Sequence, residues 1–301
     1  MNQGTTAIRG TVCRGLFGGL LVLMGATQAR AEVKTQEIEY KQGATTLQGF
    51  LAYDDAGAAK KPGILVVHEW WGHNQHARTQ AERLAKAGYV AFALDMYGKG
   101  KVTTHPKDAT AFMEEATKDP QVVAARFNAA LDLLKQQPQV NPDQIAAVGY
   151  CFGGTVSLNM LRAGAPLKAV ATFHAGLKPG GAAAEKGKIK APILVQTGGA
   201  DPFVPKDQVQ AFEKEMKDAG VKVQLVTYPL AKHSFTNPDA DKAGMEALAY
   251  NADAEKKSFP VLLKFLKAAL NAKAAGVSAP DAKVAPAIKV APAMPAPAPA
   301  K

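Results

Sequence analysis

The sequence predicts an α/β fold with a mainly parallel central sheet flanked by helices on both faces. Short apolar runs typical of buried strands alternate with amphipathic helical segments along most of the 301 residues. Gly88, Gly164 and Gly220 each follow a helical segment at its expected end. The chain is 47% hydrophobic and 21% charged, which excludes a disordered chain, a disulfide-stapled mini-protein and a collagen-like repeat.

The elements follow one another without a linker-like interruption, so one domain is expected over residues 32–272. Gly43 separates the first two strands, which predicts an antiparallel pair, and helices connect the later strands, which predicts parallel pairing. Pro260 predicts a kink or a restart in the last helix. The expected strands are 37–40, 47–53, 63–68, 90–94, 144–148, 169–173, 193–197 and 223–228, and the expected helices are 74–86, 108–118, 120–137, 155–162, 206–219 and 252–271.

The first 31 residues read as a secretory signal peptide. Arg9 and Arg14 form a basic region, residues 16–26 form an uncharged apolar run too short to span a bilayer, and Ala29-Arg30-Ala31 fits a cleavage site. The sequence therefore predicts a periplasmic or secreted protein that begins at Glu32. An uncleaved N-terminal anchor is the alternative. After cleavage no membrane association is expected, because no later stretch has 18 uncharged apolar positions.

Residues 273–301 are rich in Ala, Pro, Lys and Val and lack apolar periodicity, which predicts a disordered or polyproline-like tail. A solvated tail and one that grips an anionic surface both remain open. Removing the signal takes away three arginines and lowers the net charge from +10 to +7. The basic residues are spread along the chain and form no dense patch, so nucleic-acid binding is not expected. We expect a monomer that binds a small-molecule substrate.

The segment Gly149-Tyr150-Cys151-Phe152-Gly153-Gly154 is the most informative part of the sequence. It follows a predicted strand and opens a predicted helix, and small residues two before and two after the centre permit a tight turn that exposes the central side chain. Here that side chain is Cys151, and a helix N-terminus favours the thiolate. The alternative is a glycine-rich turn with a packed cysteine. Cys151 is the one cysteine after residue 31, so the mature chain has no internal disulfide.

A base and an orienting acid follow Cys151 in the expected chain order of nucleophile, acid and base. Asp201 lies directly after the strand 193–197, and His233 lies on the loop after the strand 223–228. Both belong to the carboxyl edge of the predicted sheet, where Cys151 also lies. Each alone could be an ordinary turn or loop residue, but together they predict a catalytic triad.

An oxyanion hole requires two backbone N–H donors. The amide of Phe152 follows the nucleophile, and the second donor is expected in the loop after the strand 63–68, where we assign Trp70. A hydrophobic lid packed on the core is the alternative reading of the Trp70-Trp71 pair.

Four motifs together resemble the dienelactone hydrolase family over about residues 35–270. They are Val67-His68-Glu69-Trp70-Trp71-Gly72, Leu94-Asp95-Met96-Tyr97-Gly98, the cysteine elbow, and His233-Ser234-Phe235. The resemblance implies an α/β-hydrolase fold with a Cys-Asp-His triad and no cofactor. It also implies that Glu69 contacts the resting thiol and controls its ionisation. Residues of these motifs, or next to them, are the expected substrate pocket: Trp71, Tyr97, Lys99 and Phe235.

The chain departs from that family where dienelactone-cleaving members carry arginines for the substrate carboxylate. Residues 98–101 and 234–238 contain no arginine, and Lys99 or Lys101 offers a point charge without a planar, bidentate grip. We therefore expect an ester or lactone hydrolase whose substrate is not dienelactone itself.

Two other functions are weighed against this hydrolase. An exported binding protein could retain the fold without activity, and a thiol redox protein is disfavoured because the mature chain lacks a resolving cysteine. No metal is expected, since His68, His73, His76, His105 and His174 have no companion at ligand spacing. Nucleotide-binding motifs are also lacking.

Overall fold

A computed structural model describes residues 1–2, 32–55 and 59–271. The chain divides into two compact units, Met1–Arg30 and Ala31–Lys301, and the fold below is that of the second. The predicted signal peptide, except residues 1–2, and the predicted tail 273–301 lie outside the described residues. None of the helices in the described parts of the chain combines the length and apolarity needed to span a bilayer.

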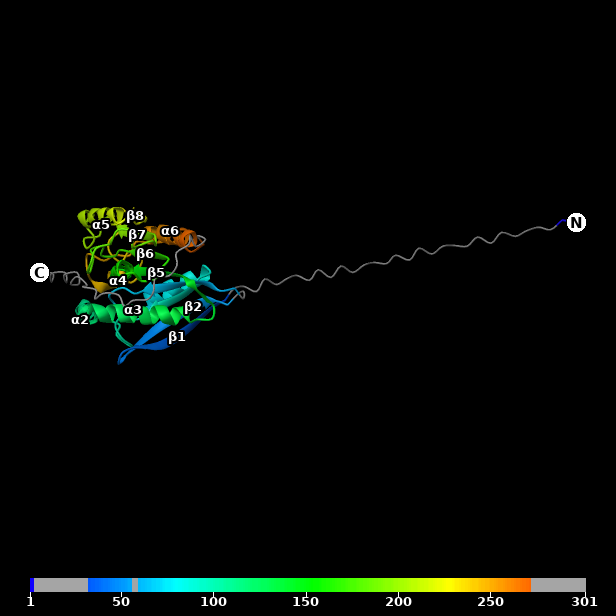
Figure 1. The fold of residues 1–301 in the computed structure, drawn as a ribbon, viewed down its shortest axis with the longest axis horizontal. Helices are drawn as coiled ribbons and strands as arrows, with labels where there is room; N and C mark the ends of the chain where they lie inside the picture. The colour runs from blue at the N-terminus through cyan, green and yellow to red at the C-terminus, as the bar shows by residue number, and fades with distance from the viewer. Residues whose placement is uncertain (3–31, 56–58, 272–301) are drawn as a thin grey trace. The chain divides into compact units, whose positions relative to one another are not determined.

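The described residues form an eight-stranded sheet in the order β1-β2-β4-β3-β5-β6-β7-β8 (Figure 1). β1 pairs antiparallel with β2 and β2 pairs antiparallel with β4, whereas every other pair is parallel. The strands are β1 (Val33–Gln42), β2 (Thr45–Asp54), β3 (Lys61–Val67), β4 (Val90–Leu94), β5 (Val140–Tyr150), β6 (Ala169–Phe173), β7 (Ile193–Gly198) and β8 (Val223–Tyr228).

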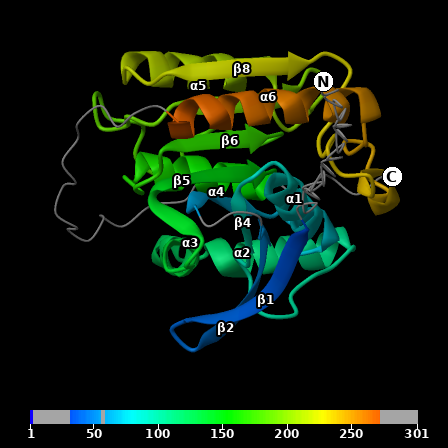
Figure 2. The same cartoon turned by 90° about the vertical axis from the view of Figure 1, so that its right-hand side faces the viewer.

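Helices cover both faces of this sheet. The side chains of β3 show why, because Ile64 and Val66 pack into the core on one face and Leu65 and Val67 into the core on the other. Figure 2 shows α6 lying over the strands on the first of these faces. That face carries α1 (Gln75–Lys86) and α6 (Ala252–Asn271), and the opposite face carries α2 (Pro106–Thr117), α3 (Pro120–Lys135), α4 (Phe152–Arg162) and α5 (Lys206–Asp218).

The strand order reverses direction between β3 and β5. The chain moves from β3 to its neighbour β4 in one direction, then crosses back over β3 to reach β5. In parallel sheets such a reversal opens a crevice at the carboxyl ends of the two strands, where ligands bind. The loop after β3 and the elbow after β5 therefore meet at this point.

The expected elements agree closely with the structure, and the α/β class is confirmed. β4, β6, β8 and α6 have the expected bounds, whereas β1, β2 and β5 are longer. α6 continues through Pro260 without a restart. The proline lies on the exposed side of the helix. The Lys256 carbonyl that loses its N–H partner there belongs to an exposed residue, so water can satisfy it.

Candidate functional site

Cys151 lies at the junction of β5 and α4 in a strained backbone conformation, with φ 52° and ψ −119°. The two flanking glycines are required by close packing. A Cβ on Gly149 would lie 2.3 Å from the Gly153 carbonyl oxygen, and a Cβ on Gly153 would lie 2.3 Å from the Val67 oxygen. The Gly153 N–H also donates to the His68 carbonyl at 3.1 Å. The elbow is thus seated directly against the end of β3.

The structure brings Cys151, His233 and Asp201 into one hydrogen-bonded row. His233 Nε2 lies 3.0 Å from Cys151 Sγ, and His233 Nδ1 lies 2.8 Å from Asp201 Oδ2. Asp201 Oδ1 accepts from the Phe203 N–H at 2.8 Å, which fixes the carboxylate. The backbone of His233 is itself held by a parallel bridge to Leu248. The three side chains that sequence predicts as a triad therefore lie within hydrogen-bond distance of one another, in the order carboxylate, imidazole and thiol.

Electrostatics favour a charged imidazole in this row. Burial alone would lower the pKa of His233, but the neighbouring Cys151 sulfur and the Asp201 carboxylate raise it well above the ordinary value. Both side chains are buried, His233 at 1% and Asp201 at 4% exposure. The imidazole can therefore hold a proton taken from the thiol while Asp201 holds the ring in place.

Two backbone amides of the elbow and of the loop after β3 have no hydrogen-bond acceptor among the described residues. The Phe152 N–H belongs to the first residue of α4, and the Trp70 N–H lies in the loop after β3; among the described residues neither donates a hydrogen bond. The seating of the elbow against β3 brings these two loops side by side. The assignment of these two amides as an oxyanion hole stays a prediction.

Glu69 is buried beside this site, and its side chain has no exposed surface. Oε1 accepts from the Ser234 hydroxyl at 2.7 Å and Oε2 accepts from the Asn237 amide at 2.6 Å. In this arrangement the thiol hydrogen-bonds with His233. The predicted contact between Glu69 and the resting thiol stays a prediction. Ser234 and Asn237 are not identified from the sequence as partners of Glu69, although they lie one and four residues after His233.

Hydrogen bonds of His68 and Asp95 fix the loops that follow β3 and β4. Burial lowers the pKa of His68, and its neutral ring donates from Nδ1 to the Glu69 carbonyl and accepts at Nε2 from the Met96 N–H at 3.1 Å. Asp95 Oδ1 accepts from the N–H groups of Tyr97 and Gly98 at 2.8 and 2.9 Å. The Leu94–Gly98 motif therefore shapes a turn that is tied to the loop after β3.

The four expected pocket residues lie in different surroundings. Trp71 is 5% exposed and packs against Trp70 with ring centroids 4.6 Å apart. Tyr97 is buried against His68 and Phe152, and its hydroxyl has no hydrogen-bond partner within the described residues. Lys99 is ion-paired with Glu39 on β1. Phe235 is fully buried in the core beneath α1 and α6.

Aromatic and apolar side chains surround the thiol–imidazole pair, and Phe203 was not anticipated among them. The Phe203 ring stands edge-on to His233 with centroids 5.1 Å apart, and both Phe203 and Trp70 are partly exposed. They pack against a small cluster apart from the two main cores, made of Trp71, Ala109, Ala240 and Leu248. The Phe203 ring is therefore apolar surface beside His233, whose ring also faces His174 with centroids 5.0 Å apart.

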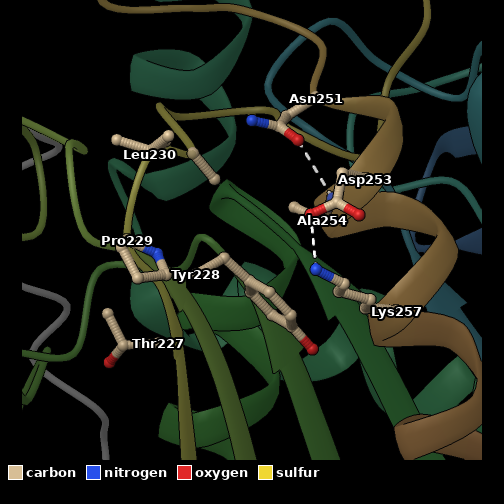
Figure 3. A pocket seen from close by; sticks show the side chains of 9 residues that line it. Thr227, Tyr228, Pro229, Leu230, Asn251, Asp253, Ala254 and Lys257 are labelled. Carbon is tan, nitrogen blue, oxygen red and sulfur yellow. Dashed lines mark hydrogen bonds and ion pairs between the residues drawn. The ribbon is translucent and has the colours of Figure 1, made fainter.

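A pocket of about 440 Å³ lies between the end of β8 and the start of α6 (Figure 3). Its charged side chains pair with each other, since Lys257 Nζ lies 2.6 Å from Asp253 Oδ2. The pocket does not include Cys151 or Asp201, so we place the candidate site at the thiol. The lining residues are Thr227, Tyr228, Pro229, Leu230, Ala231, Asn251, Asp253, Ala254 and Lys257. Across the described ranges no group of three or more His, Cys, Asp or Glu side chains is placed to hold a metal ion.

Comparison with known proteins agrees with this fold. The model of the dienelactone hydrolase family matches residues 47–270. "Protein usf" of Aquifex pyrophilus is 31% identical over 206 residues, which cover 67% of this chain and 87% of that protein. A putative carboxymethylenebutenolidase of Aquifex aeolicus is 29% identical over the same length and the same shares. Among solved structures, a dienelactone hydrolase-like promiscuous phosphotriesterase from metagenomic libraries is 35% identical with a TM-score of 0.75, covering 80% of this chain and 99% of that one.

The fold and the site define an α/β hydrolase. The chain belongs to the dienelactone hydrolase family, and its match extends from β2 to the end of α6.

The close seating of the elbow gives a first prediction. Gly153→Ala places a Cβ within 2.6 Å of the Val67 and His68 carbonyl oxygens, which are backbone atoms that cannot move aside easily. We expect the free energy of unfolding to fall by about 3 kcal/mol or more. Denaturant unfolding followed by circular dichroism measures it. Thr155→Ala in the same helix removes one hydrogen bond to the Gly176 carbonyl and is the control, with an expected loss of about 1 kcal/mol. Equal losses would contradict the argument.

Proposed function

We propose that the protein hydrolyses carboxylic esters or lactones with Cys151 as the nucleophile. The observation that carries the proposal is the row formed by the Cys151 sulfur, the His233 imidazole and the Asp201 carboxylate, with separations of 3.0 and 2.8 Å, at a strained elbow. Membership of the dienelactone hydrolase family supports the same reaction class. The Aquifex aeolicus relative, named a putative carboxymethylenebutenolidase, is consistent with it.

The chemistry follows from these positions. His233 Nε2 takes the thiol proton, and the Cys151 sulfur attacks the carbonyl carbon. The amides of Trp70 and Phe152 hold the oxyanion of the tetrahedral intermediate. When it collapses, the alkoxide leaves with the proton from His233 and a thioester remains on Cys151. Water then gives a proton to His233 and attacks the thioester, and the acid is released as the sulfur regains its electron pair.

We further propose that the substrate is uncharged near its reactive carbonyl and carries an apolar group. Phe203 and Trp70 supply partly exposed aromatic surface next to His233. Lys99 and Lys101, the cations that the sequence offers for a substrate carboxylate, are ion-paired with Glu39 and Glu115. A substrate carboxylate would have to break one of these pairs, whereas a neutral acyl or alcohol group requires no such exchange.

The catalytic assignment predicts the kinetics of three variants. In hydrolysis of p-nitrophenyl acetate, Cys151→Ala removes the nucleophile and is expected to lower kcat/KM at least about 1,000-fold. His233→Ala and Asp201→Asn remove the base and its orienting acid, with expected losses of about 100-fold or more. His105→Ala changes an exposed histidine far along the chain from the row and serves as the control, with kcat/KM within about twofold of the unaltered protein.

Folded Cys151→Ala protein that still hydrolyses the ester at the original rate would overturn the assignment. If the unaltered protein shows no turnover with a broad ester and lactone panel, the exported binding protein becomes the better explanation. Stable oxidation of Cys151 to a sulfenic acid, without ester turnover, would favour the redox alternative.

The substrate proposal predicts a preference between matched esters. Phenyl acetate is expected to have a kcat/KM at least about tenfold higher than 4-carboxyphenyl acetate, because the added carboxylate loses water without gaining a cation. Phe203→Ala and Trp70→Ala keep the backbone amides and should lower kcat/KM for phenyl acetate roughly tenfold. Lys99→Ala is the control. A preference for the carboxylate ester that disappears in Lys99→Ala would instead place charge recognition at that lysine.

We also propose that the protein is exported to the periplasm or secreted, on the basis of the basic, apolar and Ala-x-Ala segments within residues 1–31. N-terminal sequencing of the protein from a bacterial host, after fractionation into periplasm and cytoplasm, is expected to find a chain that begins at Glu32. Arg14→Glu weakens the basic region and should reduce the exported fraction several-fold. A chain that retains residues 1–31 in the membrane fraction would favour the anchor.

A further inference from the structure

Exposed lysines gather along the amino edge of the sheet, the edge at which the parallel strands β5 to β8 begin. The sequence spreads them over a hundred residues, and the fold brings them together at the edge opposite Cys151. None of them is ion-paired with a residue of the described ranges. These eight side chains are Lys168, Lys186, Lys188, Lys190, Lys217, Lys222, Lys264 and Lys267.

Backbone hydrogen bonds between neighbouring strands place two of these lysines close together. Lys168 directly precedes β6 and Lys222 directly precedes β8, with β7 between them. The Val170 N–H on β6 donates to the Pro192 carbonyl at 3.2 Å. The Ile193 N–H on β7 donates to the Lys222 carbonyl at 2.9 Å. Because adjacent strands lie about 4.8 Å apart, the starts of β6 and β8 are separated by about 10 Å.

The loop before β7 adds three lysines to the same edge within residues 186–190. The Gly187 N–H donates to the Ala219 carbonyl at 3.1 Å, which ties this loop to the end of α5, where Lys217 lies in the last turn. The Lys190 amine lies 4.0 Å from the position that a Cβ on Gly187 would occupy. The amine therefore folds over the loop beside the starts of β7 and β8.

The carboxyl end of α6 lies at this edge too. Gln144 Nε2 donates to the Leu270 carbonyl at 2.7 Å, which joins the helix end to β5. Lys264 and Lys267 lie in the last two turns, and Figure 2 shows this end of α6 beside the tails of the strand arrows. The chain beyond Asn271 continues from here. Its sequence carries Asp281 and four further lysines, Lys273, Lys283, Lys289 and Lys301.

The acidic side chains near these lysines do not balance their charge. Asp218 is already ion-paired within α5. Glu215 accepts two hydrogen bonds from Arg162, of 2.9 and 2.8 Å. Asp143 and Glu185 are the exposed acids that remain along this edge. The amino edge therefore carries a strong excess of positive charge.

The chemistry of this edge fits a surface of phosphate groups. Lysine is a compact point charge, without the planar fork that arginine offers to nucleic acids. Each lysine close to an anionic bilayer strengthens binding by about fivefold, and the attraction decays within a Debye length. The export proposed above would place the folded chain beside anionic lipids and away from nucleic acid.

We propose that the amino edge of the sheet docks the protein on the surface of an anionic phospholipid bilayer. Charge holds the protein there, and no helix inserts. Cys151, Asp201 and His233 follow the carboxyl ends of β5, β7 and β8, so the candidate site faces away from the lipid. The docking does not depend on ester hydrolysis, whereas the choice of lipid as the partner rests on the proposed export.

Sedimentation with vesicles of phosphatidylglycerol and phosphatidylcholine, compared with phosphatidylcholine alone, tests the docking. The chain from Glu32 is used, because it contains the whole compact unit with the sheet and lacks the apolar run of residues 16–26, which would bind lipid itself. We expect binding to the anionic vesicles alone, weakened at least tenfold between about 0.05 and 0.5 M salt. Equal binding to both kinds of vesicle would overturn the proposal.

Two sets of substitutions assign the binding to this edge. Lys186→Gln, Lys188→Gln and Lys190→Gln together are expected to weaken vesicle binding at least about tenfold. Lys168→Gln with Lys222→Gln, on a different part of the edge, should weaken it about fivefold or more. All five side chains are exposed, so the fold is expected to survive these changes.

A control variant removes the same charge from the other edge of the sheet. Lys107→Gln and Lys206→Gln lie at the starts of α2 and α5, and Lys178→Gln lies in the loop after β6. This triple variant should bind within about twofold of the unaltered chain. If it loses as much affinity as the Lys186, Lys188 and Lys190 variant, net charge alone explains the binding and the proposal fails.

Cys151 reports the orientation, since it is the one cysteine of the chain from Glu32. Its alkylation by iodoacetamide should keep its rate within about twofold when anionic vesicles are saturating, because the thiol lies at the other edge. Strong slowing would overturn the orientation. Tighter binding to a DNA duplex than to the vesicles at equal salt would make nucleic acid the partner and overturn the choice of lipid. A chain without ester turnover can still dock, so failure of the proposed function is distinguishable.

Discussion

The close approach of the elbow to the end of β3 is the constraint on which the site depends. Gly153 donates to the His68 carbonyl and leaves no room for a side chain against Val67. This contact places the first amide of α4 beside the loop that carries Trp70, and it places Cys151 at the reversal of strand order between β3 and β5. A looser turn would separate the Phe152 amide from the loop that carries Trp70, so the strained backbone of Cys151 is a consequence of packing that the glycines make possible.

Asp201 and His233, the other two residues of the row, are held by loops at the β7–β8 edge of the sheet. Asp201 and His233 lie on the loops after β7 and β8, and these loops cross closely, since a Cβ on Gly198 would lie 2.2 Å from the Ala231 carbonyl oxygen. The bridge between His233 and Leu248 then fixes the imidazole backbone. The two halves of the site therefore meet at one hydrogen bond between sulfur and imidazole.

The sequence alone predicts those parts of the molecule that depend on the local pattern of residue types. The strand pattern, the elbow glycines and the chain order of Cys151, Asp201 and His233 each follow from spacing and residue type, and the family match agrees with the fold. The partners of Glu69 could not be found this way, because His76 and Asn237 are brought to it by α1 and by the irregular loop after β8. The place of Lys99 in the sequence predicts a contact with substrate, but its side chain is ion-paired with Glu39 on the antiparallel strand β1.

The two buried carboxylates, Asp201 and Glu69, have different hydrogen-bond partners. Asp201 faces the imidazole that contacts the reacting sulfur, so its charge stabilises a proton on that imidazole. Glu69 faces two neutral donors and a second imidazole that does not contact the sulfur. One carboxylate is therefore joined to the sulfur through an imidazole, whereas the other is bound by a hydroxyl and an amide of the loop after β8. Environment, more than residue type, distinguishes two acids that lie close to one site.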